Sequence, residues 1–312
     1  MKIAILIATR DRPENLMVLL DSLQFSSKKF DQVVIVSSGL KISNVIQNYK
    51  FKIDHVHLEG KGQAKQKIQG IKMVEKDIDW VLFLDDDVTI TEEAFTCLIE
   101  NYLENPLYAS YSGFGLKIKN LFIPQRSKIL NKFMLFFGLQ SALPGSVLKN
   151  GHVQEYQSCQ NDIETMWLNG ISAWKTDVLQ EYKPELVDLG YSAFEDVNFS
   201  YEISKSKKLL FASRVIINSQ SETKYEPLSM NKFKIGTYIR FVFVSQHQNF
   251  SIPALLFSQI FRSFHFIAFG DKSEFVIYRM RLALVLWFDL FFSWIFKTNA
   301  LTLATRRLQD QF

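Results

Sequence analysis

Hydrophobic residues form short unbroken runs that alternate with longer helical stripes over the first 105 residues. Four runs have the length and apolar character of buried strands, at Lys2–Ala8, Gln32–Val36, Ile53–Leu58 and Trp80–Leu84. Between them, apolar residues recur at helical spacing, as in Leu16, Leu19, Leu20 and Leu23. Strands and helices that alternate with short connections predict an α/β fold with a parallel sheet and crossover helices.

The pattern is less regular after residue 105. Prolines and glycines break up the aromatic runs of residues 107–160, which predicts long irregular loops with one short helix near Ile129–Phe137. Trp167–Trp174 is predicted to be a strand in which Gly170 allows a close backbone approach. A short helix is expected at Lys175–Tyr182, and another begins at Glu195 and Asp196.

The last 87 residues differ in composition from the rest. Residues 226–312 contain ten Lys and Arg against five Asp and Glu, which gives this segment a net charge of +5, whereas the whole chain carries +4. The segment also holds 19 of the 44 aromatic residues. A helix over Arg279–Lys297 would align Arg281, Asp289, Ser293 and Lys297 along one narrow stripe. Its longest apolar run is seven residues, far short of the roughly 18–20 that span a bilayer. A helix lying in a membrane interface fits better, with Phe261–Phe269 as a second such element.

The alternative for this tail is a helix that packs on the rest of the chain or on a second subunit. Nucleic acid is not expected as a partner, because the aromatic residues are not interleaved with basic ones as a stacking platform would require. The two cysteines, Cys97 and Cys159, form neither a disulfide framework nor a metal motif, and the N-terminal apolar run Ile3–Ala8 is too short for a signal peptide. A reducing, cytoplasmic location is therefore predicted.

Three consecutive carboxylates, Asp85, Asp86 and Asp87, end the apolar run at Trp80–Leu84. They repel one another and are costly to desolvate unless a positive charge lies among them. Parallel sheets place ligands at the carboxyl ends of their strands, where Mg²⁺ or Mn²⁺ would supply that charge and attract phosphate oxygens. The alternative is a solvated acidic turn that only ends the strand and caps the next helix.

Two further segments have polar residues in patterns typical of binding sites. Gly60-Lys61-Gly62-Gln63 is a glycine-rich turn before a helix that carries Lys65, Lys67 and Lys72, which suits a diphosphate, although such turns are common and surface lysines usually only solvate a helix. Glu195 and Asp196 stand at a helix N-terminus, where the helix dipole alone stabilises negative charge. The same pair is also what a general base beside a metal site would look like.

Taken in order, these segments resemble the bacterial family 2 glycosyltransferases with the glycosyltransferase-A fold. The similarity covers roughly residues 1–222 and rests on short motifs that occur in the family's order: A-T-R-D-R-P-E-N-L, Val33–Gly39, Gly60–Gly70 with Lys65 in an arginine position, Asp85-Asp86-Asp87, Trp167–Trp174 and Gly190–Tyr201. The resemblance implies a Rossmann-like mixed, mostly parallel sheet with a C-terminal helical, aromatic-rich extension. It also implies a catalytic domain at 1–225, with a nucleotide-binding half at about 1–105 and an acceptor half at about 106–225, followed by a helical region at 226–312.

The resemblance further implies inverting transfer of a sugar from a nucleotide-diphosphate donor, with a UDP-sugar favoured, to a glycan or lipid-linked acceptor. Asp85 and Asp87 would bind the divalent metal, and Asp86 would face the ribose. Thr9, Arg10, Ser38 and Lys65 would line the nucleotide. Asp196 would be the general base with Glu195 as its neighbour, and Trp167, Gly170 and Trp174 would lie on the acceptor side. The process would be the synthesis of a surface polysaccharide or lipopolysaccharide. The protein would act at the inner face of the plasma membrane, where residues 226–312 would bind anionic lipid, and it could be a monomer or an oligomer.

Two positions depart from the family pattern, and two alternatives stay open. The acidic turn that would hold the base of the nucleotide is Ser37-Ser38 here, and the expected histidine after the later strand is absent from Val215–Gln220, where Asn218 is a weak substitute. The strand followed by D-x-D-x-T also matches haloacid dehalogenase-type phosphatases, with Asp85 as nucleophile and Asp87 as acid. A non-catalytic, membrane-bound scaffold is the third possibility.

Overall fold

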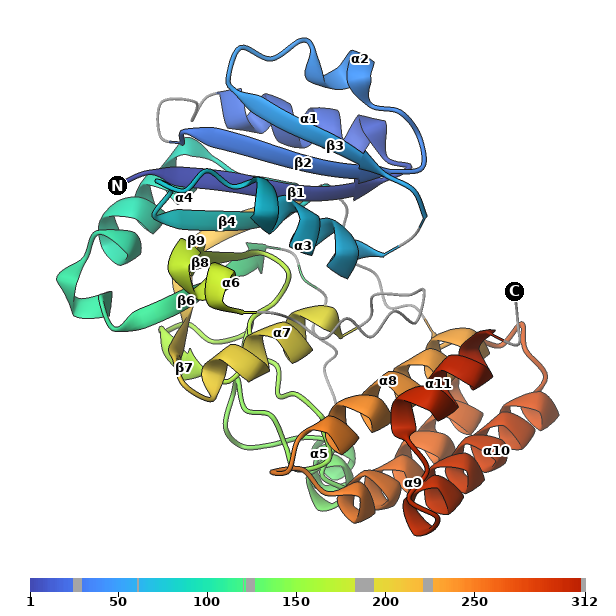
Figure 1. Cartoon of the computed structure of the whole chain (residues 1–312). Coiled ribbons are helices and arrows are strands. Elements are labelled where there is room, and N and C mark those ends of the chain that lie inside the picture. The colour runs from blue at the N-terminus through green and yellow to red at the C-terminus, as the bar shows by residue number, and fades with distance from the viewer. Residues whose placement is uncertain are drawn as a thin grey trace. The chain divides into compact units, whose positions relative to one another are not determined.

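The computed structural model describes residues 1–24, 30–60, 62–119, 121, 127–182, 194–220 and 227–309. The chain divides into two compact units (Figure 1). The first, here called the sheet unit, comprises Met1–Phe122 and Tyr156–Thr223. The second, the helical unit, comprises Ile123–Glu155 and Lys224–Phe312, so residues 123–155 cluster with the C-terminal helices rather than with the rest of the predicted acceptor half.

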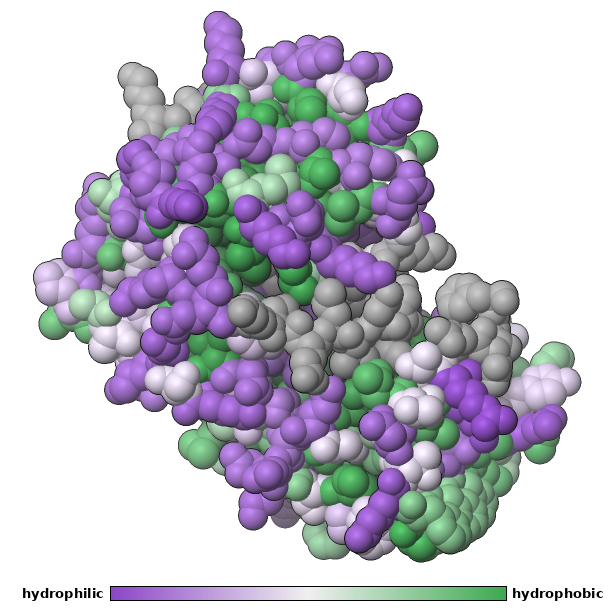
Figure 2. Space-filling view, in the orientation of Figure 1, coloured by the Kyte–Doolittle hydropathy of each residue, from purple (hydrophilic) through white to green (hydrophobic). Residues whose placement is uncertain are grey.

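Helices make up most of the helical unit, and their bounds are α5 Lys128–Phe136, α8 Met230–Gln246, α9 Ile252–Phe269, α10 Val276–Ile295 and α11 Ala300–Gln309. The predicted short helix near Ile129 and the predicted helix over Arg279–Lys297 are therefore present as α5 and α10. Stacked rings of Phe233 and Phe266, 4.1 Å apart, join α8 to α9. Hydrophobic side chains also gather on the surface of this unit (Figure 2). Among the described helices, α9 alone is long and apolar enough to cross a membrane, judged by length and composition only.

The sheet unit is built on one mixed sheet of nine strands, in the order β3-β2-β1-β4-β8-β6-β9-β5, with β7 paired to β9. The first four neighbours are parallel, whereas β8 is antiparallel to both β4 and β6. This arrangement confirms the expected mixed, mostly parallel α/β class. The strand bounds are β1 Ile3–Arg10, β2 Gln32–Ser38, β3 Ile53–Leu58, β4 Trp80–Asp85, β5 Val88–Thr89, β6 Tyr111–Lys119, β7 Ile163–Thr165, β8 Ser172–Lys175 and β9 Lys208–Ser219.

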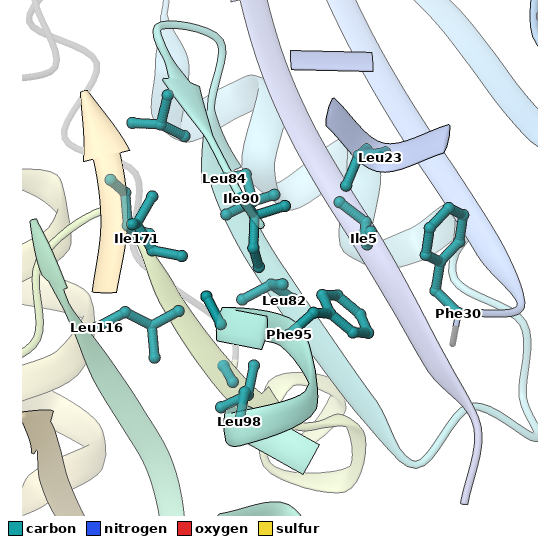
Figure 3. Packing of buried hydrophobic residues seen from close by; sticks show 14 of the residues in the cluster. Ile5, Leu23, Phe30, Leu82, Leu84, Ile90, Phe95, Leu98, Leu116 and Ile171 are labelled. Atoms are coloured by element: carbon teal, nitrogen blue, oxygen red, sulfur yellow. The ribbon is translucent and has the colours of Figure 1, made fainter. Parts of the chain in front are cut away.

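Helices cover both faces of this sheet, which explains why the strands are apolar on both sides. On one face, Ile5, Leu82 and Leu84 pack against Phe95 and Leu98 (Figure 3). The alternate residues of β1 and β4, such as Leu6 and Phe83, belong to the opposite core. The remaining elements of the sheet unit are α1 Pro13–Gln24, α2 Ser43–Ile46, α3 Gln63–Met73, α4 Glu92–Leu98 continued by a π-helix at Ile99–Leu103, a 3₁₀ turn at Pro106–Tyr108, α6 Thr176–Glu181 and α7 Glu195–Ser204.

Two predictions about the second half of the sheet were wrong. Strand β6 lies within a segment expected to be loop, because Gly113 and Gly115 interrupt its apolar pattern. These glycines are needed there, since a Cβ at Gly113 would lie 2.8 Å from the Trp174 ring and one at Gly115 would lie 3.0 Å from Leu168. The strand expected over Trp167–Trp174 begins only at Ser172, and the residues before it are irregular.

The turn after β1 contains a residue with an unusual backbone. Asp11 is left-handed (φ 55°), and its carboxylate accepts a hydrogen bond from the Leu40 backbone N–H at 2.9 Å. Gly39 also has a positive φ of 76°, and a Cβ there would lie 2.0 Å from the Asp11 carboxylate. The contact therefore joins the turn after β1 to the turn after β2, at the carboxyl edge of the sheet.

Candidate active site

The carboxyl ends of three neighbouring parallel strands bring the candidate residues together. Ala8 of β1 is in register with Asp85 of β4, and Thr9 and Arg10 are in register with Ser37 and Ser38 of β2. The acidic triplet therefore lies beside the first and second strand ends, where α/β sheets place their ligands.

Asp86 is the buried member of the triplet. The Thr9 hydroxyl donates to its Oδ2 at 2.7 Å, and the Arg12 guanidinium lies 3.2 Å from its Oδ1. Arg12 also lies 3.4 Å from Asp87 Oδ2, and its side chain is half exposed. Burial raises the pKa of Asp86 despite these partners, and burial together with the nearby Asp85 charge raises the pKa of Asp87.

Asp85 faces the second half of the site. Gln63, the first residue of α3, donates to Asp85 Oδ1 at 3.0 Å. Gly170 stands opposite, and a Cβ built there would lie 3.0 Å from Asp85 Oδ2 and 3.5 Å from the Lys67 ammonium. The lack of a side chain at Gly170 thus leaves space at the carboxylate and the ammonium.

Lys67 joins the triplet to the second acidic pair. Its Nζ lies 3.7 Å from Glu195 Oε1, and both side chains are largely buried. Burial opposes the charge of Lys67, but the Asp85, Glu195 and Asp196 carboxylates outweigh burial and hold the pKa of Lys67 above its usual value. Residues separated by more than 100 positions in the sequence therefore form one electrostatic cluster.

The first turn of α7 holds Glu195 and Asp196 in this cluster. Ser200 accepts a hydrogen bond from the Leu168 backbone N–H at 2.9 Å and donates to the Asp196 carbonyl at 2.5 Å, which ties α7 to the segment that contains Gly170. The residue before the helix, Phe194, has a left-handed backbone (φ 78°). That conformation is uncommon for a bulky residue, and such strain is concentrated at functional sites.

Both carboxyl groups of α7 bind protons more tightly than usual. Burial raises the pKa of Glu195 to about 7, Lys67 opposes this shift, and the Asp196 charge adds to it. Burial also raises the pKa of Asp196, against the effects of Lys67 and of the hydrogen bond from the Val197 N–H. A carboxyl group with a raised pKa is a stronger base once it is ionised, as proton abstraction near neutral pH requires.

Gln220 fixes the backbone around the triplet. Its side-chain amide donates to the carbonyls of Asn15, Asp86 and Val88 at 3.0–3.1 Å, and its backbone N–H donates to the Asp87 carbonyl at 2.8 Å. Asn218, the weak substitute for the missing histidine, instead pairs with Thr89 in the sheet. The end of β9 therefore positions the triplet through an amide.

The other predicted site residues have mixed placements. Ser38 is buried, and the side-chain amide of Gln66 donates to its hydroxyl and to the Thr9 carbonyl. Arg10 forms an ion pair with Asp11, and Lys65 is exposed on the first turn of α3. Trp167 and Trp174 were expected on the acceptor side, but the structure places both in the core, where the Trp174 indole bonds Ser172. The predicted loop 189–193 lies outside the described residues.

The donor set fits a hard divalent cation. Asp85 and Asp87 offer carboxylate oxygens, and their repulsion, which contributes to the raised pKa of Asp87, is what a bound cation relieves. Mg²⁺ and Mn²⁺ sites commonly use one or two carboxylates and are completed by water and substrate phosphates. In the described ranges, no group of three or more His, Cys, Asp or Glu side chains is arranged to hold a metal, so any site would rely on such exogenous oxygens.

Sequence reasoning missed three residues of this cluster: Arg12, Gln66 and Gln220. It named Lys67 as one of the lysines that suit a diphosphate but did not place it beside the α7 carboxyls; Lys67 follows the buried Gln66 on α3 and precedes Gly70, the glycine that packs against Leu6 of β1. A lysine next to such a packed face is less exposed than one on the opposite side of a helix. Gln220 gave no signal, because its side-chain partners, the carbonyls of Asn15, Asp86 and Val88, all lie more than 130 residues away in the sequence.

Comparisons with known proteins gave a family-model match for the sequence and solved structures with a similar fold. Residues 4–153 match the family model of glycosyl transferase family 2. A search of curated proteins gave no match. Among solved structures, TarS 1–349 of S. aureus in complex with UDP-GlcNAc aligns with a TM-score of 0.52 at 16% identity, covering 93% of this chain and 81% of that chain. The mannosyltransferase PcManGT of Pyrobaculum calidifontis, in complex with GDP-Man and Mn²⁺, aligns with a TM-score of 0.51 at 12% identity, covering 100% and 88%. At these identities the structures show a common fold.

Proposed function

We propose that this chain transfers a sugar, with inversion, from a nucleotide-diphosphate donor to a hydroxyl group of a glycan or lipid-linked acceptor, and the match of residues 4–153 to the family model of glycosyl transferase family 2 supports this. The observation that carries the proposal is the single cluster of Asp85, Lys67, Glu195 and Asp196 beside Gly170. A metal-binding carboxylate and a base must flank the same reacting carbon, and this cluster supports that requirement.

The donor would occupy the carboxyl ends of β1, β2 and β4. Asp86 is oriented by Thr9 and Arg12, and it would accept hydrogen bonds from the ribose hydroxyls. The N-terminus of α3, preceded by Gly62 with φ 139°, would face the diphosphate, because helix N-termini attract anions. A UDP-sugar is favoured, and GDP-mannose is the second donor to test, since the similar structures hold UDP-GlcNAc and GDP-Man.

The chemistry needs one proton transfer and one substitution. Asp196 accepts the proton of the acceptor hydroxyl as that oxygen bonds to the anomeric carbon. The bond from the anomeric carbon to the donor phosphate oxygen breaks, and its electron pair leaves with the nucleoside diphosphate. A divalent cation held by Asp85 and Asp87 would offset the charge on the leaving diphosphate. Lys67 lowers the pKa of Glu195 and of Asp196 against the effect of burial, which increases the fraction of Asp196 that is ionised and can take the proton.

A donor panel tests the proposal. UDP-glucose, UDP-galactose, UDP-GlcNAc and GDP-mannose are added with Mn²⁺, and the melting temperature and donor hydrolysis are measured. One donor should stabilise the protein, and Asp87→Asn should abolish that stabilisation. Asp196→Asn should keep it but lower hydrolysis by about 10²-fold or more. Asp77→Asn is the matched control, because Asp77 is exposed and pairs with Lys2.

The same panel separates the alternatives. Hydrolysis of p-nitrophenyl phosphate that needs no nucleotide and is lost in Asp85→Asn would favour the phosphatase. A protein that neither binds a donor nor hydrolyses either class of compound would favour the scaffold. In both cases the transferase proposal would be rejected.

A further inference from the structure

The outward face of α10 is apolar, although it faces solvent. Ile277, Leu284, Phe288, Phe292 and Ile295 recur at intervals of seven, four, four and three residues, which places them on one side of the helix. Leu284 is 59% exposed, Phe288 48% and Ile295 50%. A surface helix of a soluble domain normally carries polar residues on this side. The opposite side of α10 is the buried one, and its buried residues are Arg279, Ala283, Leu286, Leu290 and Ser293.

Two polar residues of α10, Asp289 and Ser293, face inward. Asp289 accepts hydrogen bonds from Tyr238 of α8 and Arg307 of α11, and Ser293 donates to the Thr298 carbonyl. The stripe of Arg281, Asp289, Ser293 and Lys297 predicted from the sequence is thus divided between the interior and the surface. Of its four members, Arg281 and Lys297 are exposed. The outward face of α10 therefore combines apolar side chains with Arg281, and Lys297 is exposed just beyond the end of the helix at Ile295.

Helix α9 presents a similar stripe. Phe257, Ile260 and Phe264 are exposed at intervals of three and four residues, while Gln259 on its other side is buried and reaches Thr237 of α8. Figure 2 shows hydrophobic side chains gathered over the region that α9 and α10 occupy in Figure 1. Because α9 buries Gln259 against α8, its packing favours a helix that lies on a membrane surface over one that spans the membrane.

Charge in the helical unit is divided by exposure. The acidic residues among its described ranges, Glu155, Asp271, Glu274 and Asp289, are partly exposed: Glu274 accepts from the Met230 N–H, Asp271 from Ser273, and Asp289 from Tyr238 and Arg307. Nine basic residues are exposed, namely Lys128, Lys132, Lys149, Lys232, Lys272, Arg281, Lys297, Arg306 and Arg307. The surface of this unit is therefore apolar and positively charged, with its carboxylates engaged locally.

We propose that the outward stripes of α10 and α9 bind the surface of an anionic lipid bilayer. The apolar side chains lie below the lipid headgroups, and the charged ends of Arg281 and Lys297 lie among the headgroups. Negative headgroups complement this surface, because basic residues near an anionic membrane are attracted to it. A symmetric contact with a second copy of the chain would bring the exposed cations of both copies together, which is unfavourable. The proposal does not depend on the proposed sugar transfer.

Vesicle flotation with the full-length chain tests this proposal. Vesicles of phosphatidylcholine with 30% phosphatidylglycerol are compared with vesicles of phosphatidylcholine alone, at low and high salt and without any donor. The wild-type chain should float with the anionic vesicles and less so at high salt. Leu284→Ser with Phe288→Ser should weaken binding by at least about tenfold, because less apolar surface enters the bilayer.

Matched variants separate the lipid face from general effects. Leu40→Ser with Leu107→Ser changes two exposed apolar residues of the sheet unit and should leave flotation unchanged. Arg281→Glu with Lys297→Glu should lower binding to anionic vesicles by at least about tenfold, whereas Lys41→Glu with Lys50→Glu should not. Every altered residue is exposed, so unchanged melting curves are expected and are required for each comparison.

Three results would overturn the proposal. One is a wild-type chain that does not float with anionic vesicles. Another is binding that the α10 variants and their controls lower equally. The third is an oligomer by light scattering that Leu284→Ser with Phe288→Ser converts to monomer while flotation is absent, since this would assign the face to a second copy. Donor binding is measured separately, so its failure leaves this test intact.

Discussion

Replacing Lys67 with methionine tests the electrostatic link between the two halves of the site. Methionine retains much of the length and apolar surface of the lysine stem but removes the ammonium. The change would leave Asp85, Glu195 and Asp196 without the cation that offsets their charge. We expect both α7 carboxyls to hold their protons to higher pH, because Lys67 lowers the pKa of each.

The distance gives the size of the effect. Lys67 Nζ and Glu195 Oε1 are 3.7 Å apart, and at an effective dielectric constant of about 20 they attract by about 4.5 kcal/mol. Burial of the ammonium opposes this attraction. If two thirds were cancelled, about 1.5 kcal/mol would remain, which corresponds to about a tenfold change in a protonation equilibrium. We therefore expect at least about a tenfold loss of transfer or donor hydrolysis at pH 7.

The effect on stability can be measured without a substrate. A carboxyl whose pKa is raised in the folded state binds protons that the unfolded chain releases, so the stability it contributes falls as pH rises through its folded pKa. For Glu195 that pKa is about 7, and without Lys67 it would be higher. The melting temperature of Lys67→Met should therefore lie further below that of the wild type at pH 8.5 than at pH 6.

Lys72→Met is the matched control, because Lys72 is an exposed lysine on the same helix. It should change neither the melting curve nor its pH dependence. All melts are recorded with a chelator, so that metal binding to Asp85 does not enter. A difference for Lys67→Met that is the same at both pH values, or that Lys72→Met reproduces, would refute the link between Lys67 and the α7 carboxyls.

Three further predictions use the same geometry. Gly170→Ala places a methyl group 3.0 Å from Asp85 and should lower donor hydrolysis by about tenfold or more, with a melting temperature near that of the wild type. Wild-type activity should rise between pH 6 and 8 as the carboxyls of α7 ionise. In Glu195→Gln this rise should move to lower pH, because the negative charge of Glu195 no longer opposes ionisation of Asp196. An unchanged pH profile would show that Glu195 is not part of the site. Gly39→Ala should destabilise the chain by about 1–3 kcal/mol more than Gly60→Ala in urea unfolding, since both have positive φ but only the first meets a carboxylate, at 2.0 Å.

The spacing of apolar residues predicted those strands and helices whose burial shows directly in their own sequence. Trp80–Leu84 is apolar because both faces of β4 are covered, and the structure has this strand at Trp80–Asp85. Strand β6 could not be recognised in this way, since its glycines are explained by Trp174 and Leu168 from other segments. The same reason accounts for Trp174, which the family resemblance assigned to the acceptor side although its environment is the core.

The same distinction holds for the residues of the candidate site. An acidic triplet after an apolar strand is visible in the sequence, because mutual repulsion makes three adjacent carboxylates unusual wherever they occur. Residues that compensate for this repulsion need only be near in space, so Lys67, Arg12 and Gln220 can stand anywhere in the chain. A buried carboxylate cluster therefore requires cations and amide donors whose positions only the fold can show. Lys67 meets that requirement between Asp85 and the α7 carboxyls, which is why its removal is the sharpest test of whether these groups act as one site.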